Sequence, residues 1–449
     1  MPTKKVGLYT ATAIVIANMV GTGVFTSLGF QAAGIHTGFA ILLLWIIGGI
    51  SALAGALCYA EIGGMFPRSG GEYNFLSRIY HPSVGFVSGW VSATIGFAAP
   101  VAAASIALGK YVSAVYPGVD VQYLAGGVII GISLIHATSI SIGGRFQDLF
   151  TTIKVLVMLV IIFSGLFAGH SGDISFSPTS ESWKDITSQG YAISFFFVYL
   201  AYSGWNASAY ITSEISEPKS NLPRSLLIGT GIVTFLYVAI NFVFMYVTPR
   251  AQMTDANGPV VEIAGVAAKN IFGAQGGNVM SMIIALLLIS TISSMILAGP
   301  RVTHAMGEDY RILGFLGKKT RNGVPAIAIF VQCAISLFIV HQNNFQDIVG
   351  LISFTLSIFT FLTVLGLFIM RFRAPNAERP FRVWGYPLVP FIFLAISIWM
   401  MWFGLKDDSP NSFHGLNKVS LEGLGLSLTG LLIYFIEKLI YKTKNEKVN

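Results

Sequence analysis

The chain has 449 residues, of which 54% are hydrophobic and only 10% are charged, and its mean hydropathy is +0.71. Soluble globular domains carry about 25% charged residues, so this composition excludes a soluble protein and predicts a polytopic membrane protein. The formal net charge of +7 is therefore interpreted as a signature of membrane orientation, and no basic patch for nucleic acid can be assembled.

Twelve apolar stretches are long enough to cross a bilayer, which requires about 20 helical residues. They lie at 8–32, 39–65, 83–113, 122–140, 146–168, 188–212, 222–248, 278–305, 325–342, 346–370, 386–405 and 420–441. With a cytoplasmic N-terminus, 21 of the 27 Lys and Arg residues fall on the inner side and six on the outer side. This asymmetry predicts a multi-pass protein of the plasma or bacterial inner membrane with both termini cytoplasmic.

The first span is interrupted by Gly21-Thr22-Gly23. Glycines permit non-helical backbone, which is tolerated at membrane depth only where it lines a cavity or is buried in protein. The restarted helix would point its N-terminal N–H groups and the positive end of its dipole at the gap, which suits a carboxylate. A seam of small residues for helix packing is the alternative interpretation.

Lys154 lies deep in the fifth span, nine residues after Arg145, which is about 13 Å along a helix. Ionisable residues inside the membrane are costly, and they usually face a cavity and mark function. Snorkelling to the inner surface is the alternative, although the side chain spans only about half that distance. We expect a fixed ammonium beside the first break that acts as a bound cation does elsewhere, or that gains and loses a proton.

The sixth span is interrupted at Tyr202-Ser203-Gly204-Trp205-Asn206. Backbone carbonyls that lose their helical partners here suit an ammonium group. Tyr202 and Trp205 could wall the pocket, act as gates or pack as ordinary core aromatics, and Asn206 could hold the unwound stretch or reach the ligand. Two matched breaks, from Gly21 to Gly204, predict an inverted-repeat secondary transporter with its substrate near the midplane.

This pattern predicts an all-α membrane protein of 12 transmembrane helices, a 5+5 inverted repeat with discontinuous helices 1 and 6. Its parts are the first five-helix repeat (1–168), an outer loop (169–187), the second inverted repeat (188–371), and helices 11 and 12 with a cytoplasmic tail (372–449). The outer connections 169–187 and 249–277 are expected to be loops. The inner connections 61–73 and 214–224 are either latches that close one gate through ion pairs or simple loops.

Nothing in the sequence supports an enzyme, a cofactor or a metal site. The histidines lack metal-ligand spacing, and no Ser-His-Asp group, phosphate loop or haem-type His pair can be assembled. Cys58 and Cys333 lie inside apolar spans and are interpreted as small core residues.

Motifs spread along the whole chain resemble the amino acid–polyamine–organocation superfamily, and most of all its L-type amino acid transporter branch. They are Asn18-Met19-Val20-Gly21-Thr22-Gly23-Val24-Phe25, Pro67 with Gly70-Gly71-Glu72-Tyr73, Arg145-Phe146-Gln147-Asp148 leading to Lys154, Ala201-Tyr202-Ser203-Gly204-Trp205-Asn206 running on to Asn221-Leu222-Pro223, and Arg379-Pro380-Phe381-Arg382. The resemblance implies a LeuT-type fold and sodium-independent, one-for-one exchange of L-amino acids.

The resemblance also implies roles for individual residues. It implies that residues 21–23 bind the substrate carboxylate and that the backbone carbonyls of Met19, Leu200 and Ser203 bind the substrate amino group. Lys154 replaces the sodium ion of sodium-coupled relatives. Asn206 lies beside the substrate, and Tyr237 corresponds to a tyrosine near the lysine. The substrate-binding candidates are Met19, Val20, Gly21, Thr22, Gly23, Leu200, Ala201, Tyr202, Ser203, Gly204, Trp205 and Asn206, and the coupling candidates are Lys154 and Tyr237.

The chain departs from its relatives at two places. Many relatives carry an aromatic gate where this chain has Leu200, so the lid over the substrate is less bulky. Animal members hold a glycoprotein partner through a cysteine in the outer loop between helices 3 and 4, whereas Ser113–Gln122 contains none. We therefore expect no disulfide-linked heavy subunit and a free-standing, bacterial-type transporter.

Charge at the breaks limits the substrate. No acidic residue is evident there, which argues against cationic amino acids as substrates. Apart from Lys154 no basic residue is available to pair with an acidic side chain, which argues against anionic amino acids. Small neutral L-amino acids remain as the expected substrates. Obligatory exchange, proton-coupled symport with Lys154 as the titrating group, and a non-transport role as a channel, complex subunit or integral enzyme stay open as alternatives.

Overall fold

The structure is a computed structural model that describes residues 6–68, 70–138, 143–169, 172–255, 258–406 and 414–445. At 143–148, 213 and 442–445 only the backbone is described, so the side chains of the motif 145–148 lie outside the described part of the chain. Most of the described backbone is helical, as the composition predicts for a membrane protein whose backbone must satisfy its own hydrogen bonds.

The described helices of the first part of the chain begin with a broken pair. They are α1 (Leu8–Met19), α2 (Thr22–Gly34), α3 (Gly38–Met65), α4 (Glu72–Ile79), α5 (Pro82–Val91), a π-helical turn η1 (Ser92–Gly96), α6 (Ala98–Ser113), α7 (Val121–Thr138) and α8 (Gly143–Phe167). Together α5, η1 and α6 form one long span.

A second broken pair opens the rest of the chain. The elements are α9 (Ser180–Ile186), α10 (Gln189–Tyr202), α11 (Ala207–Tyr210), η2 (Thr212–Glu214), α12 (Pro218–Val247), η3 (Arg250–Gln252), the strands β1 (Thr254–Asp255) and β2 (Gly258–Pro259), α13 (Ile263–Asp309), η4 (Arg311–Leu313), α14 (Ala326–Gln342), α15 (Phe345–Arg373), α16 (Leu388–Leu405) and α17 (Lys418–Asn445). The two strands form an antiparallel hairpin.

Among the described residues, ten segments are long and apolar enough to cross a membrane. The predicted ninth span is α14, a shorter apolar helix, and the predicted sixth is divided between α10 and α11. The polytopic, all-helical class is confirmed, as are the discontinuities in helices 1 and 6. The count of twelve spans and the inverted relation of the two halves stay predictions.

The connections 169–187 and 249–277, which we expect to be outer loops, contain regular structure. In 169–187, the side chain of Thr179 accepts a hydrogen bond from the backbone N–H of Ser182 and caps α9. In 249–277, a hairpin precedes the start of α13, which is kinked at Gly273 with a φ of 74°. The kink explains why apolar periodicity alone places the beginning of this span later.

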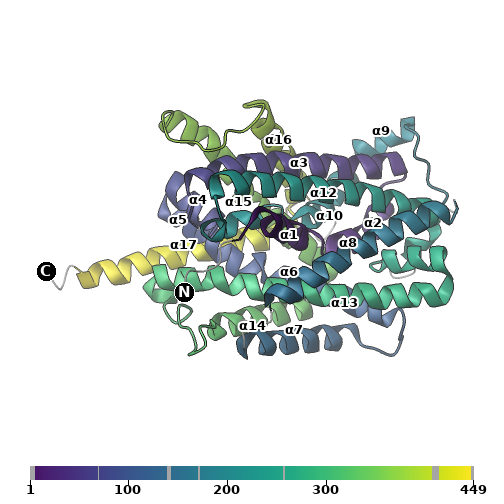
Figure 1. Cartoon of the computed structure of the whole chain (residues 1–449), viewed down its shortest axis with the longest axis horizontal. Helices are drawn as coiled ribbons and strands as arrows, with labels where there is room; N and C mark the ends of the chain where they lie inside the picture. The colour runs from purple at the N-terminus through teal and green to yellow at the C-terminus, as the bar shows by residue number, and fades with distance from the viewer. Residues whose placement is uncertain are drawn as a thin grey trace.

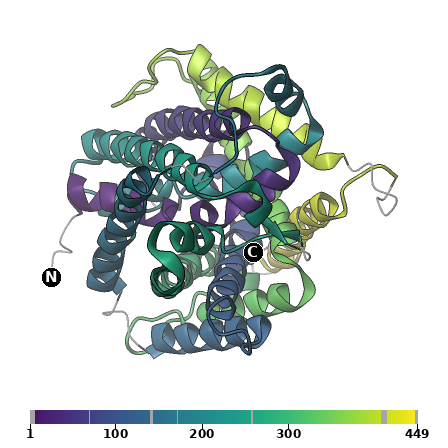
Figure 2. The ribbon, with the colours of Figure 1, turned by 90° about the vertical axis from the view of Figure 1, so that its right-hand side faces the viewer.

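The long helices run along one common direction in Figure 1 and are viewed nearly end-on in Figure 2. The helix α4 lies at one end of the bundle and α9 at the other (Figure 1), and we call these the α4 end and the α9 end. The broken pairs occupy the interior, where α1 packs on α12 and α8, and α2 packs on α10. At the periphery, α17 leaves Leu428, Leu432 and Leu439 exposed, as expected for a lipid-facing helix.

Candidate functional site

The break in the first span lies between Met19, the last residue of α1, and Thr22, the first of α2. Gly21 has a φ of −136° and a ψ of −143°, outside the helical region. A Cβ at Gly23 would overlap the Cα of Ala201 in α10, so only glycine permits this approach of the two helices. The packing interpretation of this motif therefore holds at Gly23, while a binding role for the motif stays a prediction.

The break in the sixth span follows Tyr202 and ends at Ala207, where α11 begins. Gly204 has a φ of +94°, which disfavours any side chain, and a Cβ there would also lie 2.9 Å from the backbone of Asn18. The two breaks therefore cross in direct contact. Segments that are far apart in the sequence meet at this point.

A small cavity of about 30 Å³ lies where the breaks cross. Its lining residues are Asn18, Met19, Gly21, Thr22, Gly23, Pro100, Ala103, Leu200, Ser203, Thr291 and Met295. This volume accommodates about two water molecules. An amino acid would fit only after the lining moves apart, so the structure is a closed arrangement.

Half of the predicted substrate residues line this cavity, namely Met19, Gly21, Thr22, Gly23, Leu200 and Ser203. The other six, Val20, Ala201, Tyr202, Gly204, Trp205 and Asn206, are not among its lining residues. Sequence reasoning missed Asn18 as a binding candidate, together with Pro100 and Ala103 from α6 and Thr291 and Met295 from α13. Their residue types are common in membrane helices, so nothing local marked them.

Lys154 is 1% exposed, which excludes snorkelling to a membrane surface in this arrangement. Its Nζ donates a hydrogen bond of 2.9 Å to Thr291 Oγ1. Thr291 in turn lines the cavity and lies directly beside Gly21. Within the described ranges no carboxylate pairs with Lys154. One threonine thus links the ammonium of α8 to the break between α1 and α2.

Tyr237 of α12 is fully buried, and its hydroxyl contacts both broken helices. The O–H lies within hydrogen-bond distance of the carbonyl oxygens of Met19 and Ala201. The carbonyl of Leu200 accepts hydrogen bonds from the backbone N–H and the side chain of Ser203. Two of the carbonyls predicted to bind a substrate ammonium are thus already occupied in the closed arrangement, although each carbonyl has a second lone pair.

The aromatic side chains of the second break point toward α3. Tyr202 donates a hydrogen bond of 3.0 Å to the carbonyl of Trp45, and the Trp205 ring packs edge-on against Tyr59 at 4.7 Å. The structure therefore favours core packing for these two aromatics over a role as pocket walls. Asn206 also points away from the cavity lining, because its Nδ2 donates to Glu72 Oε1 at 3.1 Å.

Ion pairs join separate elements at the α4 end. Glu61 of α3 is fully buried, with Arg371 Nη2 at 2.6 Å and Arg379 Nε at 3.1 Å from its carboxylate. Arg68 forms a more exposed ion pair with Asp309 at 3.2 Å. The connection 61–73 is thus anchored by ion pairs, as the latch hypothesis requires, while its role in gating and its place on the inner side stay predictions.

A polar cluster closes the α9 end. Asp185 of α9 accepts hydrogen bonds from the backbone N–H groups of His36 and Thr37, which join α2 to α3. Burial acts to raise the pKa of Asp185, but hydrogen bonds from His36 and Thr37 hold it below its ordinary value. Nearby, Arg250 donates to the carbonyls of Ala32, Ile35 and His36 at the end of α2. The C-terminus of α2 is therefore held in place by charged groups.

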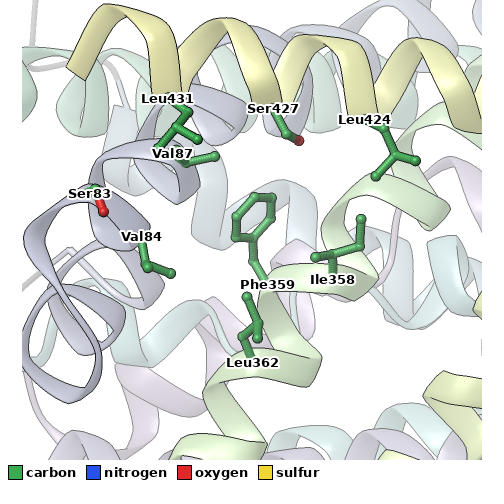
Figure 3. Close-up of a pocket in the computed structure, with 9 residues that line it drawn as sticks. All are labelled: Ser83, Val84, Val87, Ile358, Phe359, Leu362, Leu424, Ser427 and Leu431. Carbon is green, nitrogen blue, oxygen red and sulfur yellow. The ribbon is translucent and has the colours of Figure 1, made fainter. Parts of the chain in front are cut away.

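A larger cavity of about 230 Å³ lies between α5, α15 and α17. Figure 3 shows its nine lining side chains, which are Ser83, Val84, Val87, Ile358, Phe359, Leu362, Leu424, Ser427 and Leu431. Its only polar side chains are two serines, so it offers no partner for the two charges of an amino acid. The smaller cavity at the breaks is therefore the candidate site. Among the described residues, no group of three His, Cys, Asp or Glu side chains could hold a metal ion.

The regions that match known proteins include both breaks. A family model described as amino acid permease matches residues 6–415. The b(0,+)-type amino acid transporter 1 of Mus musculus is 28% identical over 408 residues, 89% of this chain and 82% of its own length. Asc-type amino acid transporter 1 of Mus musculus is 27% identical over 444 residues, which are 96% of this chain and 81% of its own length. The Large neutral amino acids transporter small subunit 2 of Homo sapiens is 25% identical over 444 residues, which are 96% of this chain and 80% of its own length.

Proposed function

The chain belongs to the amino acid permease family, and on this premise we propose that it exchanges small neutral L-amino acids one for one across the membrane, without sodium. The observation that carries the proposal is the cavity at which the two broken helices cross. Alternating access follows from that position, because the half-helices on either side of the breaks can move while the site stays near the middle of the spans.

The two breaks offer complementary partners for a zwitterion. The first N–H groups of α2, around Thr22 and Gly23, have no partner within the helix and carry the positive end of its dipole, so they bind the carboxylate. The carbonyls of Met19, Leu200 and Ser203 bind the ammonium group. Because Met19 and Leu200 already accept hydrogen bonds, substrate entry requires Tyr237 and Ser203 to share or release them.

The lining restricts the side chain of the substrate. Pro100, Ala103 and Met295 supply apolar surface, and no acidic or basic side chain is among the lining residues of the cavity. A charged amino acid would therefore leave an unpaired charge in a desolvated site. This lining supports neutral amino acids, such as alanine and serine, as substrates.

Lys154 takes the part of a bound cation in this proposal. Through Thr291 the ammonium is held beside Gly21, where it favours the closed packing of α1 against α8 and α13 without requiring sodium. A proton-coupled symporter is the second candidate, because Lys154 is buried with a hydroxyl as its hydrogen-bond partner and forms no ion pair with a carboxylate among the described residues.

The membrane assembly is also part of the proposal. Both cysteines of the chain are buried and free, so a disulfide to a heavy subunit has no available thiol in this arrangement. The name of one relative includes "small subunit", which makes a second subunit relevant to that protein. For this chain we propose a free-standing transporter of the cell membrane with both termini in the cytoplasm.

Uptake of labelled L-alanine into proteoliposomes in sodium-free buffer tests the proposal. We expect uptake into vesicles preloaded with unlabelled L-serine and none into empty vesicles. L-Serine outside should compete, whereas L-arginine and L-glutamate should not. Uptake into empty vesicles under an inward proton gradient would instead establish the symporter, and absence of uptake for every neutral amino acid would overturn the substrate class.

A further inference from the structure

The larger cavity, between α5, α15 and α17, lies at the depth of lipid tails. Its lining residues on α15 fall at 358–362, near the middle of that helix and far from its terminal charges Asp347 and Arg371. On α17 the lining extends over 424–431, which covers about 10 Å of the helix. The surroundings of the bundle at this depth are hydrocarbon. The cavity therefore opens, if it opens to the outside, into acyl chains.

Two close contacts hold α17 against its neighbours on either side of the cavity. A Cβ at Gly423 would overlap the side chain of Thr355 of α15. A Cβ at Gly430 would lie 2.7 Å from the ring of Trp90 of α5. Between these contacts the face of α17 carries Ser427, whose side chain is too small to fill the space. The gap is therefore bounded by packed contacts and is not closed by its own lining.

The chemistry of the lining restricts what can occupy the cavity. Seven of the nine lining side chains are apolar and the other two are serines, so a polar ligand would lose its hydrogen bonds to water without replacement. Cavities with apolar linings also stay free of water. A helix with its side chains is about 10 Å across, which is too wide for a cavity of about 230 Å³. A hydrocarbon chain is narrow and needs no hydrogen-bond partner.

The cavity is continuous with the lipid-facing surface of the bundle. Eight of its nine lining residues are partly exposed, and the ninth, Phe359, is 4% exposed. Figure 3 shows the Phe359 ring directed from α15 into the space beside α17. Leu428 and Leu432, which follow the lining residues Ser427 and Leu431 in the sequence, are 61% and 62% exposed. The lipid around the outer face of α17 is thus next to the opening.

We propose that this cavity binds one acyl chain of a membrane phospholipid, which fills the space between α5, α15 and α17 and fastens α17 to the bundle. The bound chain supplies the dispersion contacts that the lining side chains lack when the cavity is empty. This site goes beyond the proposed function, because it depends neither on the transported substrate nor on the mode of transport.

Photolabelling of the purified chain in phosphatidylcholine vesicles tests the proposal. One probe is phosphatidylcholine with a diazirine near the middle of an acyl chain, and a second carries the diazirine on its headgroup. After illumination and digestion, mass spectrometry locates the labelled residues. We expect the acyl-chain probe to label both Phe359, at the back of the cavity, and the exposed Leu432, and the headgroup probe to leave Phe359 unlabelled. Labelling of Leu432 without Phe359 by the acyl-chain probe would overturn the inference.

A matched pair of variants on α17 gives a second test. Ser427→Trp places an indole ring in the cavity, so labelling of Phe359 by the acyl-chain probe should fall to the level of the headgroup probe while Leu432 stays labelled. Leu428→Trp adds the same side chain on the outward face, one residue away, and should preserve both labels. Equal labelling of Phe359 in the two variants would contradict a chain in the cavity. If Ser427→Trp does not fold, the comparison of the two probes on the wild-type chain still decides the question.

Discussion

At the residue scale, the site depends on a few side chains that connect distant parts of the chain. Lys154 and Thr291 are 137 residues apart and form one hydrogen bond. Tyr237 reaches the ends of both α1 and α10 from α12. Such residues stabilise one arrangement of the breaks, so substitutions there should alter transport more than folding.

Lys154→Ala should reduce exchange by at least about tenfold, equivalent to about 1.4 kcal/mol of barrier, because the closed packing beside Gly21 loses its fixed cation. Thr291→Val, which removes only the hydroxyl group, should reduce exchange in the same direction. The measurement is exchange in proteoliposomes alongside size-exclusion profiles. Lys184→Ala, on the exposed face of α9, serves as the control. Unchanged exchange in Lys154→Ala would show that the ammonium has no part in transport.

Gly23→Ala should impair exchange strongly, because the added methyl group would overlap the backbone of Ala201 and no side-chain rotation can relieve that contact. We expect a loss of at least about tenfold, as for a barrier change above 1.4 kcal/mol. Gly127→Ala on α7 is the matched control, since a Cβ there meets open space. Similar exchange in the two alanine variants would contradict a close approach of α2 and α10.

At the element scale, the α4 end is held by charge and the α9 end by charge and aromatic packing. The buried Glu61 joins α3 to α15 and to the segment that follows it. At the α9 end, Phe30 of α2 stacks between Phe197 of α10 and Phe345 of α15. The contacts at both ends therefore involve unbroken helices, α3 and α15 among them. These unbroken helices form a frame around the half-helices.

Glu61→Gln should destabilise the protein by about 3–5 kcal/mol, because it leaves the buried guanidinium of Arg379 and that of Arg371 without their counter-charge. The check is thermal unfolding in detergent, with a lowered unfolding temperature expected. The exposed pair Lys219–Glu378 supplies the comparison, and Glu378→Gln should leave the unfolding temperature unchanged. Equal unfolding temperatures for wild type and Glu61→Gln would show that this ion pair contributes little.

At the scale of the whole molecule, the closed arrangement explains why so small a cavity can belong to a transporter. A site of about 30 Å³ cannot hold an amino acid, so binding and a change in the positions of the half-helices must occur together.

The sequence by itself determined the class of protein and the position of the breaks. Low charge and long apolar stretches require membrane helices, and the glycines at 21, 23 and 204 mark where the helical backbone is interrupted or closely approached. Lys154 was found because an isolated charge inside an apolar span is costly wherever the span lies. Each of these features is local, so its physical reason can be read from neighbouring residues.

Only the tertiary structure decided which side chains meet. Pro100, Ala103 and Thr291 line the cavity although nothing in their local sequence distinguishes them. Tyr202 and Trp205 turn toward α3, and Asn206 binds Glu72 across 134 residues of sequence. The direction of a side chain and the charge of its surroundings depend on helices that pack against it from distant parts of the chain. Hydrophobic periodicity does not encode that packing.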